Sequence, residues 1–132
     1  MNQESASTSS SQLIDWTALS KRFGNRQDFI DKLLRMSHAS HIEMLEKLQS
    51  AIRTRDLEAI AFIAHGLRGT AGNLEAQGMR DLASETEASV RAGRADPMAL
   101  AEELARLLER LLAELARHLE SSSDNKRSEN LL

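Results

Sequence analysis

The apolar residues of this chain recur with the period of an α-helix in five successive segments, which constrains the fold more than any other feature. Apolar side chains three or four residues apart form a stripe along one side of a helix, and that stripe has to be buried. No segment shows the period-two alternation of a half-buried strand. The spacing predicts helices over about 15–23, 25–52, 56–74, 79–92 and 96–119.

Capping residues support these boundaries. Aspartate and asparagine accept hydrogen bonds from the first free amides of a helix, and proline suits the first helical position. The expected N-terminal signals are Asp15, Asn25 with Asp28 three residues on, Asp56, and the Asp96-Pro97 pair. The expected stops are Gly24, the stretch 76–78 and Gly93.

Short connections between long helices force neighbouring helices to run antiparallel. We therefore predict an all-α fold: an up-down antiparallel four-helix bundle with an additional short N-terminal helix across one end. The polar, Ser-rich ends are expected to be disordered, which divides the chain into a tail or linker over 1–11, a domain over 12–120 and a tail over 121–132. The predicted core positions are Leu13, Trp16, Leu19, Phe23, Phe29, Leu33, Met36, Met44, Leu45, Leu48, Ile52, Leu57, Ile60, Ala64, Leu67, Ala71, Leu74, Leu100, Leu104, Leu107, Leu108, Leu111, Leu115 and Leu119.

Charge and composition exclude several classes of protein. A net charge of -3 argues against a nucleic-acid binder, which would show a basic excess. The absence of cysteine excludes disulfides and thiolate metal sites. No apolar run is long enough for a membrane span, and the polar N-terminus does not resemble a signal peptide. We expect a cytoplasmic monomer without direct membrane contact, which could be the cytoplasmic part of a membrane-bound protein.

The third predicted helix contains an unusual run, AFIAHGLRGTAGN, over residues 61–73. Three glycines inside a helix each cost roughly 1 kcal/mol relative to alanine. A projection at about 100° per residue places several residues on the same side of the helix as His65, while the predicted core residues of this helix lie on another side. That side holds Glu58, Ala61, Phe62, Arg68, Gly69 and Gly72.

This arrangement suits phosphoryl transfer. Neutral imidazole is a nucleophile near pH 7, and the phosphohistidine product is anionic. The Arg68 guanidinium can stabilise phosphoryl oxygens, and the small Gly69 leaves a shallow pit beside the ring.

The run AHGLRGTAGNL, followed by a helix containing DLASETE, resembles the signature of histidine phosphotransfer (HPt) domains, Ala-His-x-Leu-Lys-Gly and then a small residue. On this resemblance His65 matches the phospho-accepting histidine, Arg68 the basic residue and Gly69 the glycine. The similarity is densest over 57–87, and helix order and lengths agree over about 13–118. Two departures stand out: Arg68 replaces the more frequent lysine, and Glu75 stands where a glycine is common.

The resemblance implies a phosphocarrier rather than an enzyme. His65 would accept a phosphoryl group from a receiver-domain aspartate and pass it to another receiver, with Arg68 stabilising the group. The expected docking residues are Glu58, Ala61, Phe62, Gly69 and Gly72. No cofactor or metal is expected on the chain, because Mg²⁺ would belong to the receiver. No ATP-binding loop is evident, although the parent protein could be a hybrid sensor histidine kinase, from which the linker-like N-terminus suggests excision.

Several alternatives remain open from the residues alone. The chain could be a helical adaptor that binds a kinase or receiver without carrying phosphate. His38 and His41, three residues apart, could bind a metal but are predicted to be surface histidines. Gly69 and Gly72 could permit close helix packing instead of docking, and Phe62 could lie at the core edge. His118 is expected near a helix C-terminus, where the helix dipole favours it.

Overall fold

The computed structural model describes residues 12–94 and 96–131, and all of its regular elements are helices. They are α2 (Trp16–Arg22), α3 (Gln27–Arg53), α4 (Leu57–Asn73), α5 (Gln77–Ala92) and α6 (Pro97–Leu131). The expected disordered segment 1–11 lies outside the described residues. No helix in the described part of the chain is long and apolar enough to cross a membrane.

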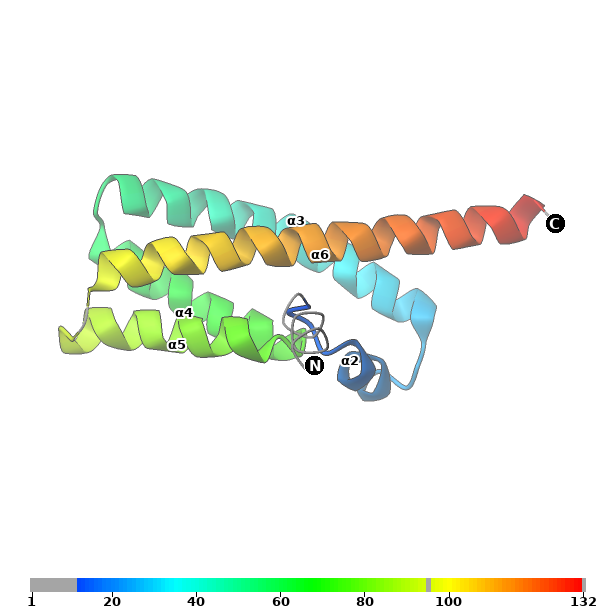
Figure 1. The fold of residues 1–132 in the computed structure, drawn as a ribbon, viewed down its shortest axis with the longest axis horizontal. Coiled ribbons are helices and arrows are strands. Elements are labelled where there is room, and N and C mark those ends of the chain that lie inside the picture. The colour runs from blue at the N-terminus through cyan, green and yellow to red at the C-terminus, as the bar shows by residue number, and fades with distance from the viewer. Residues whose placement is uncertain (1–11, 95, 132) are drawn as a thin grey trace, which may run out of the picture.

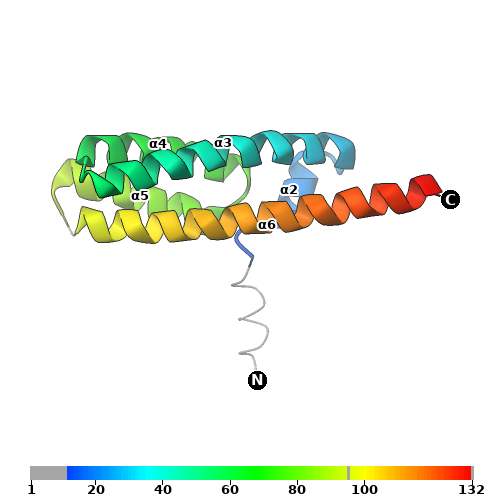
Figure 2. The same cartoon turned by 90° about the horizontal axis from the view of Figure 1, so that it is seen from above.

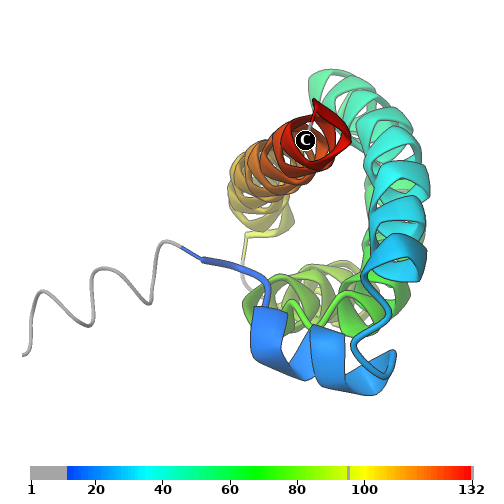
Figure 3. The ribbon, with the colours of Figure 1, turned by 90° about the vertical axis from the view of Figure 1, so that its right-hand side faces the viewer.

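The four long helices form the predicted up-down antiparallel bundle (Figures 1 and 2). Each packs against its neighbours in sequence, and α6 closes the bundle by packing on α3 as well as α5. The most extensive contact joins α4 and α5. Viewed from the end, the short α2 crosses one end of the bundle, as predicted (Figure 3).

Three of the predicted caps are present. Asp15 and Asp56 accept hydrogen bonds from the amides of Ala18 and Ala59 at 3.0 and 3.1 Å. Asp96 accepts one from the Met98 amide at 3.1 Å, directly before Pro97 begins α6. The cap predicted at Asn25 is wrong. Gly24 and Asn25 both adopt left-handed backbone conformations, so α3 begins two residues after Asn25 and no side chain caps it.

Two other boundaries differ from the predictions. The break between α4 and α5 lies at 74–76 rather than at 76–78, because Glu75 adopts a left-handed φ of 58° and Gly78 is helical. Arg22 holds this strained residue through an ion pair of 2.8 Å with its carboxylate. The last helix continues from Leu119 to Leu131, so the predicted disordered tail at 121–132 is wrong for 121–131. No proline or glycine interrupts this segment, and Ser122 donates a hydrogen bond to Asp31.

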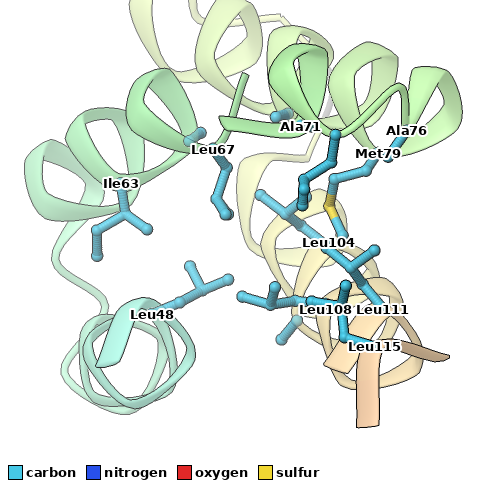
Figure 4. Close-up of a cluster of buried hydrophobic side chains, with 14 of the residues drawn as sticks. Leu48, Ile63, Leu67, Ala71, Ala76, Met79, Leu104, Leu108, Leu111 and Leu115 are labelled. Atoms are coloured by element: carbon cyan, nitrogen blue, oxygen red, sulfur yellow. The ribbon is translucent and has the colours of Figure 1, made fainter. Parts of the chain in front are cut away.

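Leucine, isoleucine and alanine side chains from α3 to α6 meet in a single core (Figure 4). Ile60, Ala64, Leu67 and Ala71 of α4, and Leu74 directly after it, point inward as predicted. In the N-terminal half of α3 the buried side is shifted by one residue from the prediction, since Phe29 and Met36 are exposed while Ile30 and Leu34 are buried. Leu57 is also exposed, because it lies in the first turn of α4. The remaining predicted core positions are buried or partly buried, although Leu33 and Leu100 are outside the main cluster.

Candidate functional site

His65 lies in the middle of α4, and its side chain is 59% exposed. The inward-facing residues before and after it fix the rotation of α4, because Ile60, Ala64 and Leu67 are all fully buried. Packing of these residues therefore directs the imidazole outward. The ring is held on a rigid helix rather than on a loop, which gives it a defined position.

A carboxylate from the next helix holds one nitrogen of this ring. Glu87 of α5 lies with Oε2 3.1 Å and Oε1 3.3 Å from His65 Nδ1. An ionised carboxylate can only accept a hydrogen bond, so Nδ1 carries the proton and donates it. Neutral His65 then has its lone pair on Nε2, which makes no hydrogen bond within the described residues.

Two arginines flank this carboxylate. Arg68 Nη1 lies 3.7 Å from Glu87 Oε1, and Arg91 Nε lies 3.8 Å from Oε2. Arg68 Nη2 also approaches His65 Nδ1 to 3.3 Å. Guanidinium has only donors, so with a protonated Nδ1 this last approach is a close contact and not a hydrogen bond. The site thus combines one imidazole, the Glu87 carboxylate and two cations on the α4 and α5 surface, and Arg91 is shared with a second carboxylate, that of Glu58.

The predicted docking residues do not all lie on the surface. Phe62 is 76% exposed, one turn before the histidine, and is not at the core edge. Glu58 is exposed, with its carboxylate 3.4 Å from Arg91 Nη1. Ala61 is fully buried, so its predicted role in docking is wrong. Its methyl group is therefore not available to a docking partner.

The three glycines of α4 have different surroundings. A Cβ on Gly69 would meet nothing within 4 Å, and one on Gly72 would meet only the Arg80 side chain, at 3.8 Å. A Cβ on Gly66 would lie 3.2 Å from Met44 Cε of α3. Packing against Met44 therefore limits the space at Gly66, but no neighbour limits it at Gly69 or Gly72.

His41 serves the fold. His41 was predicted at the surface but is 1% exposed. Its Nδ1 lies 2.7 Å from the Ser37 carbonyl and its Nε2 lies 2.9 Å from Thr70 Oγ1 of α4. Burial lowers the pKa of His41. Among the described residues no group of three or more histidine, aspartate, glutamate or cysteine side chains could hold a metal ion.

His118 is not at a helix end, because α6 continues well beyond it. It stacks on Trp16 with ring centroids 4.3 Å apart and lies 3.6 Å from the buried Asp31 carboxylate. The predicted interaction of His118 with the helix dipole is therefore wrong, and its contacts with Trp16 and Asp31 give it a structural role instead.

Sequence reasoning missed Glu87, although it belongs to the DLASETE segment that follows the signature. A spacing of 22 residues and an intervening turn separate it from His65, so helical periodicity alone could not pair them. The missing signal was the packing of α5 on α4, which only the tertiary structure supplies.

Comparisons with known proteins identify the family of this chain. The family model described as Hpt domain matches residues 32–124. A search of curated protein sequences found no significant match.

Two solved structures share the fold. One is the histidine-containing phosphotransfer protein B (HptB) from Pseudomonas aeruginosa PAO1, with 23% identity and a TM-score of 0.70. It is aligned over 86% of this chain and 96% of that protein. The other is the HPT domain of the Hpt sensor hybrid histidine kinase from Shewanella, with 18% identity and a TM-score of 0.71, over 83% and 95% of the two chains. With the family model matching well over half of its residues, this chain belongs to the Hpt domain family, whose members take part in histidine phosphotransfer in two-component systems.

Proposed function

We propose that this chain is a phosphocarrier in which His65 accepts a phosphoryl group from a receiver-domain aspartate and passes it to the aspartate of another receiver. One observation carries the proposal: an exposed imidazole whose Nδ1 is held by Glu87 while Nε2 is free. This arrangement supports Nε2 as the nucleophile. We further propose that the chain acts as a monomer.

In the proposed reaction the Nε2 lone pair attacks the phosphorus of an aspartyl phosphate. A nitrogen–phosphorus bond forms while the phosphorus–oxygen bond to the aspartate breaks, and the aspartate leaves as a carboxylate. Positive charge develops on the imidazole during the attack. The Glu87 carboxylate, 3.1 Å from Nδ1, lies where it stabilises that charge. The second transfer reverses these steps onto another aspartate.

A carboxylate beside the histidine would repel an incoming phosphoryl group if it stood alone. Arg68 and Arg91, both within 4 Å of the Glu87 oxygens, offset this negative charge. Arg68 also borders His65 directly and can contact the phosphoryl oxygens. We propose that the Mg²⁺ ion of the reaction stays with the receiver, so the chain requires no cofactor of its own.

The direct test is transfer from a panel of phosphorylated receiver domains to the wild-type chain and to His65→Gln. We expect acid-labile, alkali-stable label on the wild type and none on the variant. Because the side chain is exposed, the variant should retain its free energy of unfolding within about 0.5 kcal/mol. Receiver binding that is unaffected by the substitution, with no label on either protein, would support the adaptor instead.

Glu87 provides a second test, of the tautomer. Glu87→Ala removes the acceptor for Nδ1–H, and loss of one charge-assisted hydrogen bond of about 1.5 kcal/mol predicts a roughly tenfold slower transfer. Glu87→Gln keeps an acceptor oxygen and should recover much of the rate. Equal rates for the alanine variant and the wild type, measured by single-turnover transfer, would show that Glu87 does not position the ring.

A further inference from the structure

A hollow of about 390 Å³ lies beside His65, where α4 ends and the chain turns into α5. Three arginines from three helices surround it: Arg22 from α2, Arg68 from α4 and Arg80 from α5. Arg68 also contacts the His65 ring, so the hollow is continuous with the phosphotransfer site.

The charges around this hollow do not balance. Glu75 is the single acidic residue that lines it, and Arg22 pairs with that carboxylate at 2.8 Å. Arg68 lies 3.7 Å from Glu87, on the side toward His65. The guanidinium of Arg80 forms no ion pair or hydrogen bond with any residue that the structure describes. The hollow therefore offers cationic donors to an anionic group from outside.

Gly69 and Gly72 also line the hollow. Neither is needed for packing within the chain, since an added Cβ would meet nothing at Gly69 and would make an ordinary contact at Gly72. Glycine at these helical positions nevertheless weakens the helix. What their missing side chains provide is open space between His65 and the arginines, which favours a contact with another molecule.

The opposite side of His65 has different chemistry. Phe62, one turn earlier on α4, is an exposed aromatic ring. The α4 surface from Phe62 to Gly72 spans about 15 Å at 1.5 Å per residue. It is apolar at one end, carries the imidazole near its middle and is basic at the other end.

We propose that the hollow between Arg22, Arg68 and Arg80 receives a carboxylate side chain of the receiver domain that docks on His65. This inference rests on the proposed phosphocarrier function and adds the chemistry of the partner. Guanidinium groups bind carboxylates with paired hydrogen bonds, and complementary charge accelerates the encounter of two proteins. The apolar end and the basic end together allow one docking orientation and select receivers with an acidic residue beside their phosphorylation site.

The test compares Arg80→Glu with Arg106→Glu, a matched charge reversal at an exposed position on α6. Transfer from the panel of phosphorylated receivers is measured at low and high salt. Each variant is also labelled with phosphoramidate, a small donor that transfers its phosphoryl group to the imidazole and releases ammonia. For Arg80→Glu we expect at least a tenfold lower kcat/KM with receivers at low salt, a weaker dependence on salt, and unchanged labelling by phosphoramidate. Arg106→Glu should behave like the wild type.

Other outcomes separate the inference from the function on which it rests. Receiver transfer within twofold of the wild type for Arg80→Glu would overturn the docking inference and leave the carrier function intact. An equal loss with phosphoramidate would also overturn it, because the arginine would then act on His65 and not on the partner. If changing the acidic residue of a receiver to lysine restored its transfer to Arg80→Glu, this would establish the contact between that residue and Arg80. If no receiver labels the wild type although phosphoramidate does, the phosphocarrier proposal itself fails.

Discussion

Two carboxylate–imidazole pairs in this molecule use the same chemical groups in opposite surroundings. His65 and Glu87 meet at 3.1 Å on the exposed side of α4 and α5. His118 and Asp31 meet at 3.6 Å where α2, α3 and α6 join, and the Asp31 side chain is 1% exposed. The His65 ring is 59% exposed and leaves Nε2 open to a second reactant, whereas the His118 ring is 30% exposed and its Nε2 is buried toward Asp31.

The buried joint is held by a second carboxylate as well. Glu114 of α6 accepts hydrogen bonds from the amides of Leu13 and Ile14 at 2.6 and 3.2 Å, and from Trp16 Nε1 at 2.9 Å. These hydrogen bonds attach the segment before α2 to α6, and Trp16 stacks on His118 of the same helix. The comparison teaches that the surroundings of an acid and a histidine, rather than their identity, distinguish a structural joint from a reactive site.

The largest expected effect on stability is at Glu114. Glu114→Ala leaves three donors without their acceptor in a buried place, so we expect the free energy of unfolding to fall by about 3 kcal/mol. Urea denaturation measures this, with Glu103→Ala at an exposed position of the same helix as the control. Labelling of the folded variant by phosphoramidate should be unaffected. If the free energy of unfolding of Glu114→Ala changed by less than about 0.5 kcal/mol, the hydrogen bonds of Glu114 would not be what holds α2 in place.

A smaller effect concerns His41, which is buried on α3 with its Nε2 2.9 Å from Thr70 Oγ1 of α4, the helix that carries His65. Burial lowers its pKa below the ordinary value, so the unfolded chain binds a proton more readily than the folded one. The free energy of unfolding therefore declines as the pH falls below about 6.5 and toward the lowered pKa, by at most about 1.4 kcal/mol per pH unit from this group. His41→Gln should lose this contribution. Identical pH profiles for variant and wild type in urea titrations would contradict it.

The smallest expected effect has the opposite sign. Gly69→Ala should raise the free energy of unfolding by up to about 1 kcal/mol, because alanine favours the helix and its methyl group meets no neighbour. Transfer from receivers should nevertheless slow, since the methyl group stands beside His65 on the proposed docking surface. Gly66→Ala is the matched control, and its gain should be smaller because Met44 lies 3.2 Å from the added Cβ. A faster transfer in Gly69→Ala would exclude docking at this glycine.

The sequence by itself determined the helical class, the antiparallel order and the caps at Asp15, Asp56 and Asp96. These follow from local physics, because hydrogen bonds of a cap and the period of an apolar stripe involve residues close in the chain. The outward direction of His65 was also predictable, since the large apolar residues around it fix the rotation of α4.

Tertiary structure decided the rest. Polar residues at core positions, such as Asp31 and His41, could not be predicted because their partners lie on other helices or depend on the packing around them. The rotation of α3, which buries Ile30 and Leu34 and exposes Phe29 and Met36, depends on the helices packed against it. Glu87 reaches His65 for the same reason, because only the packing of α5 on α4 brings residues 22 positions apart into hydrogen-bonding distance.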